Sequence, residues 1–279
     1  MRASSILTLA GLALAGTALA DDFEPKKASD DDLVACLERP EVELRIECSA
    51  YMARRGLVDR QDALIQAAMM DKAPKVRLAA LQALRDLEAP GLMKAAATMA
   101  LSDALTSNRA HALGVIEKDG GEGAAGVVVE AMADDDATIA RKAVIIVGKR
   151  GFSEGEPWLM EHGIQHAEPA VVEQAWKTIT RLGNPDLRTQ VHKALTEGNE
   201  SVRKAVARAM RDTVLPADKD ALIRALDDSN THVARDAAKA LVALGDASVA
   251  PVLRQKAAAA VDESVQAGFD KAAAKLEAQ

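Results

Sequence analysis

The segment DKAPKVRLAALQAL, residues 71–84, decides the fold, because its pattern returns along the chain every 31 or 32 residues. A second clear copy is EGNESVRKAVARAM, residues 197–210. Each copy has an anchor residue that is followed, four and eight positions later, by apolar or small residues. The eight anchors are Leu44, Val76, Asn108, Ile139, Val171, Val202, Val233 and Val265. Such a period is typical of a solenoid, in which stacking of neighbouring units completes the core.

Each repeat contains two predicted helices. Apolar residues at the anchor and four, eight and eleven positions later indicate an amphipathic helix, called helix B here. Apolar residues eleven and seven positions before the anchor, such as Leu33 with Leu37 and Ile65 with Met69, indicate a preceding helix A. Glycines twelve positions after the anchor suit a left-handed helix end: Gly56, Gly120, Gly151, Gly183 and Gly245. Together with an aromatic content of 2%, the pattern predicts an all-α solenoid of eight antiparallel helix pairs over residues 29–279.

Both ends of the helices carry capping signals. The run from Ser29 to Asp32 has the form of a capping box that opens the first helix. Aspartates five positions before an anchor are expected to cap free amides near the start of helix B; they are Asp71, Asp103, Asp134 and Asp228.

With its aspartate, its alanines and its glycine, the repeated pattern resembles the HEAT repeat, in the short variety named after phycobilisome lyases and related to armadillo-like helical arrays. The resemblance covers residues 29–279. It implies that helix B lines the concave side and that an aspartate–arginine ladder joins the turns. Arginine directly after the anchor is kept only in Arg45, Arg77, Arg109 and Arg203, so the ladder is expected to be incomplete. The resemblance specifies a fold and leaves activity open.

The first twenty residues have the pattern of a cleavable signal peptide. Arg2 gives a positive start, residues 6–14 are apolar but too short to span a bilayer, and Ala18-Leu19-Ala20 is a small-residue cleavage site. We therefore expect cleavage after Ala20, a short linker over residues 21–28, and a periplasmic or secreted protein. A retained membrane anchor is the alternative. No later apolar run is long enough to span a membrane.

The expected export bears on the oxidation state of the two cysteines. Cys36 on helix A and Cys48 on helix B of the first repeat lie about equally far from the turn between them. The hairpin brings them face to face, so we expect a disulfide in an oxidising compartment. The alternative is a redox-active pair, but the Cys-x-x-Cys spacing that lowers a thiol pKa is absent.

Catalytic and cofactor signatures are hard to find. His162 and His166 are four residues apart on one predicted helix A, a spacing that binds metal when a third ligand converges, but a solvated helix face is the better interpretation. HEAT-like hydroxylases use His-Glu dipeptides, and this chain has none. The net charge of −7 and the few aromatic residues disfavour nucleic-acid binding. We expect a monomer that is not an enzyme and needs no cofactor. An enzyme, or an enzyme-associated factor of the lyase type, is the alternative.

The predicted B helices are basic although the chain as a whole is acidic. Since the resemblance implies that helix B lines the concave side, we expect a basic stripe there that binds a protein partner through an acidic segment. The alternative is a merely solvated helix face. Arg141, Lys142 and Lys204 are predicted in the first helical turn, where the helix dipole disfavours cations. The candidate residues are Arg141, Lys142, Lys149, Lys177, Arg181, Lys204, Arg208 and Arg211.

Overall fold

The computed structural model describes residues 23–278, so the predicted signal peptide and the start of the predicted linker lie outside the described residues. Within that range the chain forms sixteen α-helices and no strand. The helices follow one another as eight A–B pairs, which confirms the predicted all-α solenoid. No helix in this range is long and apolar enough to cross a membrane.

The B helices carry the repeated anchor pattern, and each is 13 to 15 residues long. Their bounds are α2 (Val42–Arg54), α4 (Pro74–Asp86), α6 (Thr106–Asp119), α8 (Ala137–Arg150), α10 (Pro169–Leu182), α12 (Glu200–Thr213), α14 (Thr231–Leu244) and α16 (Glu263–Glu277).

Most A helices are shorter, and several follow a 3₁₀ turn. Their bounds are α1 (Asp30–Cys36), α3 (Gln61–Met70), α5 (Leu92–Ser102), α7 (Ala124–Ala131), α9 (Glu156–Glu161), α11 (Pro185–Glu197), α13 (Lys219–Ala225) and α15 (Ala250–Ala259). The 3₁₀ turns are η1 (Val58–Arg60), η2 (Ser153–Gly155), η3 (Gly163–Gln165), η4 (Pro216–Asp218) and η5 (Ala247–Val249).

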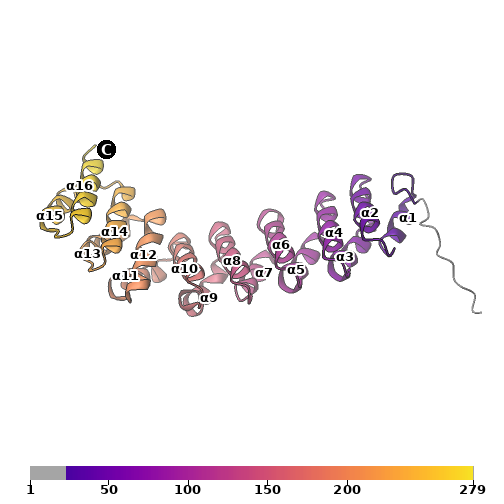
Figure 1. Ribbon diagram of the computed structural model, residues 1–279, viewed down its shortest axis with the longest axis horizontal. Helices are drawn as coiled ribbons and strands as arrows, with labels where there is room; N and C mark the ends of the chain where they lie inside the picture. Colours follow the sequence, from indigo (N-terminus) through magenta and orange to yellow (C-terminus); the bar gives the residue numbers. More distant parts are fainter. Residues whose placement is uncertain (1–22, 279) are drawn as a thin grey trace, which may run out of the picture.

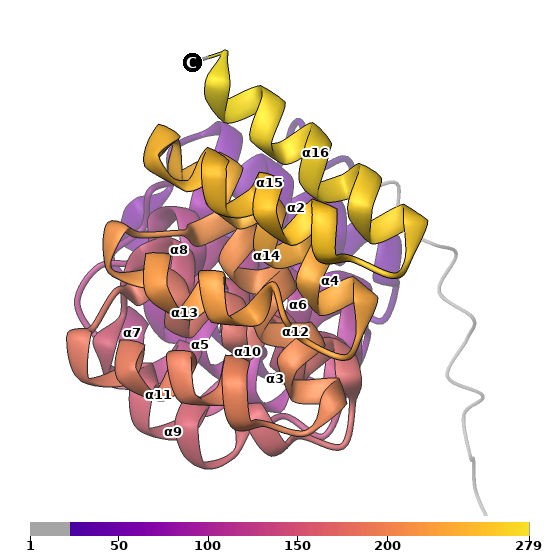
Figure 2. The ribbon, with the colours of Figure 1, turned by 90° about the vertical axis from the view of Figure 1, so that its left-hand side faces the viewer.

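The pairs stack into an elongated, curved array (Figure 1). The B helices lie along the inner side of the curve and the A helices along the outer side, as Figure 1 shows from α2 to α16. Figure 2 looks along the array from its C-terminal end, where successive pairs lie behind one another. The inner face is therefore built from one B helix per repeat.

The core consists of the residues that the repeat places against helix A. The residues four positions after the anchors are all buried: Cys48, Ala80, Ala112, Ala143, Ala175, Val206, Ala237 and Phe269. The residues eight positions after are buried as well: Met52, Leu84, Ile116, Val147, Ile179, Met210, Leu241 and Ala273. The small residues four positions after the anchors let paired helices approach closely. Each repeat thus buries its apolar face against its own partner helix and its neighbours.

The polar anchor Asn108 is also buried, and its amide is satisfied. Its Nδ2 donates to the Pro74 carbonyl oxygen at 3.0 Å and to Asp103 Oδ2 at 3.2 Å. A buried polar group with partners carries little penalty. Asn108 therefore ties the third repeat to the second.

In the second repeat the inward face of helix A differs from the prediction. Ile65 and Met69 were expected to face the core, but Leu64 is fully buried there, while Ile65 and Met69 stay partly exposed. Ile65 instead packs against Gly91, where a Cβ would meet its side chain. The same one-position shift of the buried face recurs in α5, α9 and α15, where Ala96, Leu159 and Leu253 are buried.

The glycines at the ends of the B helices are mostly as predicted. Gly151, Gly183 and Gly245 have φ values of 70°, 70° and 74°, and Gly56 has 69°. The prediction for Gly120 was wrong, because its φ is −70° and Gly123 takes the left-handed conformation instead. After α6 the chain is extended at Gly120 and makes its left-handed turn three residues later, at Gly123.

In the second repeat, Glu88 stands twelve positions after the anchor, where most other repeats have glycine, and its φ is 49°. A left-handed conformation costs a residue with a side chain about 1–2 kcal/mol. We expect Glu88→Gly to stabilise the protein by about 1 kcal/mol, measured as a shift in urea unfolding. Gly56→Ala is the matched inverse, since a Cβ there meets nothing within 4 Å, and it should destabilise by a similar amount. Loss of stability in Glu88→Gly would contradict this account.

The N-terminal repeat is secured by several contacts. Ser29 and Asp32 form the predicted capping box, in which each backbone amide donates to the other side chain at 3.2 Å. Cys36 and Cys48 are bonded, which joins α1 to α2. Arg55 donates to the carbonyl oxygens of Ala28 and Lys26, so the segment before α1 packs on the first repeat. These contacts close the end of the array.

Candidate protein-interaction surface

An arginine–aspartate ladder runs along the edge formed by the turns between A and B helices. Each ladder arginine donates from Nε to one carboxylate oxygen of an aspartate in the following repeat, at 2.6–2.8 Å. Its Nη2 donates to the other oxygen of the same carboxylate. Charge-assisted bidentate pairs of this kind fix geometry as well as energy. The pairs are Arg45–Asp71, Arg77–Asp103, Arg109–Asp134 and Arg203–Asp228.

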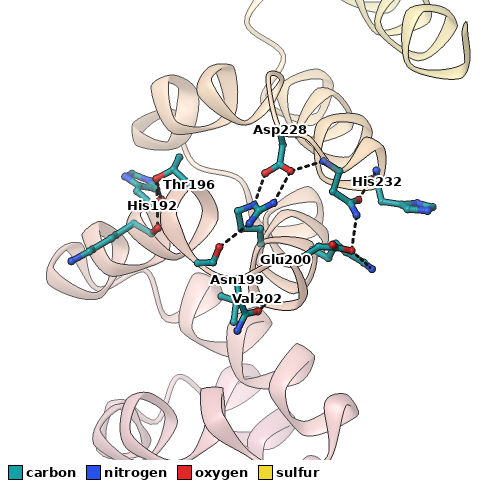
Figure 3. Close-up of polar contacts among 12 residues, drawn as sticks. His192, Thr196, Asn199, Glu200, Val202, Asp228 and His232 are labelled. Carbon is teal, nitrogen blue, oxygen red and sulfur yellow. Dashed lines mark hydrogen bonds and ion pairs between the residues drawn. The ribbon is translucent and has the colours of Figure 1, made fainter. Parts of the chain in front are cut away.

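The ladder aspartates also cap the turns, as the sequence predicted. One carboxylate oxygen of Asp71 accepts the amide of Ala73 at 2.8 Å, just before α4. Asp228 accepts the amide of Asn230 in the same way before α14. The labelled side chains of Asp228, Glu200 and His232 surround that turn in Figure 3. Burial raises the pKa of Asp228, but the hydrogen bonds from Arg203 and the Asn230 amide outweigh it and hold the pKa below its ordinary value.

The ladder is interrupted in the middle of the array, as expected from the missing arginines. Ala140 and Val172 occupy the arginine position in the fourth and fifth repeats. Joints there are held differently: Thr178 Oγ1 donates to the Val144 carbonyl at 2.9 Å between α10 and α8.

A buried ion pair on the other edge of the array was missed by sequence reasoning. Arg188 on α11 contacts Asp218 at the end of η4, and both are almost fully buried. Arg188 also donates to the carbonyl oxygens of Thr180 and Thr213, so it links three repeats. His192 lies 2.7 Å from Asp218. No other repeat has these residues at matching positions, so the period gave no signal for them.

The structure places the eight candidate cations on α8, α10 and α12, along the inner side of the array in Figure 1. Arg141, Lys149, Arg181 and Arg208 are exposed, and the others are partly exposed. They are not concentrated in one pocket. Instead they are spread along three neighbouring helices.

Five of these cations are paired with carboxylates of the chain itself. The pairs that cross between neighbouring repeats are Lys149–Glu117 at 2.8 Å, Arg208–Glu173 at 3.0 Å and Arg211–Asp236 at 3.5 Å. Lys177–Glu173 at 3.0 Å and Lys204–Glu200 at 3.4 Å lie within one helix. Within residues 23–278, Arg141, Lys142 and Arg181 make no ion pair. These three cations are therefore the candidates that can pair with a partner without first breaking an ion pair of the chain.

The placement of Arg141, Lys142 and Lys204 in the first helical turn was wrong. Helix α8 begins at Ala137 and α12 at Glu200, so these residues lie in the second turn. The helix dipole falls off within the first turn. The dipole therefore gives no reason to regard them as unusual. The case for Arg141 and Lys142 rests on their missing ion-pair partners, whereas Lys204 is paired with Glu200.

Two further exposed cations, outside the eight candidates, lie on the following B helices. Lys239 on α14 and Lys271 on α16 occupy the same repeat position as Lys177 and Arg208, and both are exposed. The 31-residue period could have found them, because each lies six positions after its anchor.

The predicted common helix for His162 and His166 is not present. Helix α9 ends at Glu161, His162 follows it, and His166 lies after η3. The Nδ1 atom of His166 accepts the amide of Glu168 at 3.0 Å, as an aspartate does in the ladder turns. No group of three or more metal-binding side chains occurs among the residues that the structure describes.

Trp176 on α10 is buried, and Trp158 on α9 is partly exposed. The indole nitrogen of Trp176 has no hydrogen-bond partner among the described residues. Neither tryptophan lies on the basic inner face.

Comparison with known structures finds similar helical arrays. YibA of Escherichia coli is 21% identical, with 91% of this chain and 94% of that chain covered and a TM-score of 0.48. The complex of CpcE and CpcF of phycocyanin lyase from Nostoc is 14% identical, with 94% and 98% covered and a TM-score of 0.40. A designed armadillo repeat protein is 17% identical, with 89% and 100% covered and a TM-score of 0.32.

Sequence comparison is more specific. No curated protein matches the chain significantly. The family model for HEAT repeats matches residues 124–211, 156–237 and 188–272, which together cover more than half of the chain. These matches begin at α7 and end within α16, so they coincide with the helix pairs of the last five repeats. The chain therefore belongs to the family of HEAT repeat proteins.

Proposed function

We propose that this protein is an exported interaction scaffold that binds an acidic segment of a partner protein on the inner face of α8, α10 and α12. The observation that carries this proposal is the state of Arg141 and Lys142. Both lie on the inner face without an ion pair among residues 23–278, whereas most charged side chains nearby are paired.

The charge distribution supports an acidic partner. The chain has a net charge of −7, so a basic inner face contrasts with an acidic body. Unpaired cations raise the local concentration of anionic groups and orient them as they approach. A negatively charged partner would be repelled by the acidic outer surface and directed to the basic inner face.

Two features support export. The first twenty residues have the signal-peptide pattern, and the Cys36–Cys48 disulfide suits an oxidising compartment. We place the protein in the periplasm or outside the cell, as a monomer that binds stoichiometrically and without turnover.

Charge reversal tests the proposal. In the variant Arg141→Glu, Lys142→Glu and Lys204→Glu, like charges would face the acidic segment. We expect capture of the partner, cross-linked in intact cells and recovered by pull-down, to fall at least about tenfold at low salt, which corresponds to about 1.4 kcal/mol. Capture by the unaltered protein should weaken as salt is raised.

A matched control keeps the number of reversed charges and moves them away from the inner face. Lys72, Lys94 and Arg224 are exposed and lie on A helices or their turns. Their reversal should leave capture unchanged. Unchanged capture by the inner-face variant at low salt would reject the proposal.

A further inference from the structure

One cation occurs at the same position of helix B in four consecutive repeats. Six positions after the anchors stand Lys177, Arg208, Lys239 and Lys271, on α10, α12, α14 and α16. We call these four residues the cation column. They follow one another along the inner side of the array, as the order of these helices in Figure 1 shows. The side chains of Arg208 and Lys239 are each 52% exposed.

A carboxylate of the chain itself shows what fits between members of the column. Glu173 lies 3.0 Å from Lys177 Nζ and 3.0 Å from Arg208 Nη1, so it bridges two neighbouring repeats. Burial raises the pKa of Glu173, but the two cations outweigh it and hold the pKa below its ordinary value. The position between two column cations therefore stabilises an ionised carboxylate.

The next two intervals of the column have no such bridge. Lys239 pairs with Asp236 on its own helix at 2.9 Å, and Asp236 also contacts Arg211. Among residues 23–278, no carboxylate joins Arg208 to Lys239 or Lys239 to Lys271, and Lys271 makes no ion pair. Unlike the interval that Glu173 bridges, these two intervals have no carboxylate shared by two column cations, and a carboxylate of the partner can take that place.

The spacing of the column defines the segment that would supply it. Packed helices lie about 8–10 Å apart. A chain in the extended polyproline II conformation has three residues per turn and advances about 3.1 Å per residue, so every third side chain lies on one face and three residues span one repeat. The array bends between α10 and α16 in Figure 1, and an extended chain follows such a bend more readily than a stiff helix.

We propose that the cation column binds an acidic segment of the partner in the extended polyproline II conformation, with carboxylates at every third residue. This inference rests on the proposed function and specifies its partner. It also extends the binding surface from the sixth repeat to the end of the array.

Two labelled peptides of identical composition test the spacing. One is (Glu-Gly-Ser)5, and the other has its five glutamates in one block before the glycines and serines. We expect the regularly spaced peptide to bind the full chain at least about threefold more tightly at low salt, measured by fluorescence anisotropy. Net charge alone would give both peptides the same affinity, so the difference reports the spacing.

Neutralising the column should remove this preference. The variant carries Lys177→Gln, Arg208→Gln, Lys239→Gln and Lys271→Gln. The matched control carries Lys72→Gln, Lys94→Gln, Lys193→Gln and Arg224→Gln, which removes the same charge from exposed sites on the A helices and their turns. Circular dichroism shows whether both variants keep their helices. The control should retain the preference for the regular peptide.

The outcomes separate this inference from the proposed function. Equal binding of the two peptides, no binding of either, or a preference that survives in the column variant would each overturn the inference. Tighter binding of a helical peptide with glutamate at every seventh residue would overturn the extended conformation. The proposed function is decided separately, by partner capture with the variant at Arg141, Lys142 and Lys204.

Discussion

Replacing Asp218 with alanine is expected to destabilise the protein by about 3–5 kcal/mol, as is typical when one partner of a buried ion pair is removed. Asp218 is fully buried and accepts hydrogen bonds from Arg188, from the Leu215 amide at 2.7 Å and from His192 when that nitrogen carries its proton. Its loss leaves the Arg188 guanidinium buried without a counter-charge. Because Arg188 also joins α10 to α12, the damage should spread across three repeats.

Urea unfolding followed by circular dichroism measures this effect. Asp227→Ala is the control, because Asp227 is 63% exposed and pairs only with Lys256 at the surface. Exposed pairs contribute about 0–1 kcal/mol. If Asp218→Ala unfolded within about 1 kcal/mol of the unaltered protein, the buried pair would not have the role assigned to it.

The same aspartate makes stability depend on pH. Burial raises the pKa of Asp218, but hydrogen bonds from Arg188, His192 and the Leu215 amide outweigh it, so the pKa lies below its ordinary value. A group with a lowered folded-state pKa contributes stability above its unfolded pKa, about 3.9 for aspartate, and loses it as the pH falls through the folded value. The unaltered protein should therefore lose stability in acid more steeply than the Asp218→Ala variant.

Removing the disulfide is the second large perturbation. Cys36→Ala with Cys48→Ala should destabilise the first repeat by about 3 kcal/mol, since the bond closes a short loop in a repeat with only one neighbour. The two cysteines are 12 residues apart, and both are buried. Hydrogen exchange of α1 and α2 should accelerate, while α12 and α14 keep their protection.

Reductant provides the control for this prediction. It should destabilise the unaltered protein to a similar extent and leave the double variant unchanged. Equal stability of the oxidised protein and the double variant would contradict the assigned contribution. Mass spectrometry of protein from its native compartment adds a test of export, because two free thiols there would reject the expected oxidation.

The period of the sequence predicted most of the fold, because each packing position recurs eight times. Ala80, Ala143 and Ala237 repeat one small-residue contact, and such a contact needs no tertiary information to recognise. Features that occur once could not be found in this way. Arg188 and Asp218 have no counterparts in other repeats.

For the candidate surface, the sequence predicted which helices are basic but not how much of that charge is free. Glu173 neutralises cations of two repeats at once, because inner-face side chains of neighbouring helices lie side by side. This could have been inferred in part, since Glu117 precedes its partner Lys149 by 32 residues, one repeat. Arg141 and Lys142 have no ion-pair partner because no carboxylate of a neighbouring repeat lies beside them. Only the packed array shows this.

Photo-cross-linking in intact cells tests the central claim, that the inner face receives the partner, most directly. A photoreactive amino acid is placed at Gln174 on α10, among the candidate cations, or at Lys193 on the outer helix α11. The account predicts a discrete cross-linked partner from position 174 that is lost in the variant at Arg141, Lys142 and Lys204, and none from position 193. The same partner captured from position 193, with none from position 174, would contradict the account.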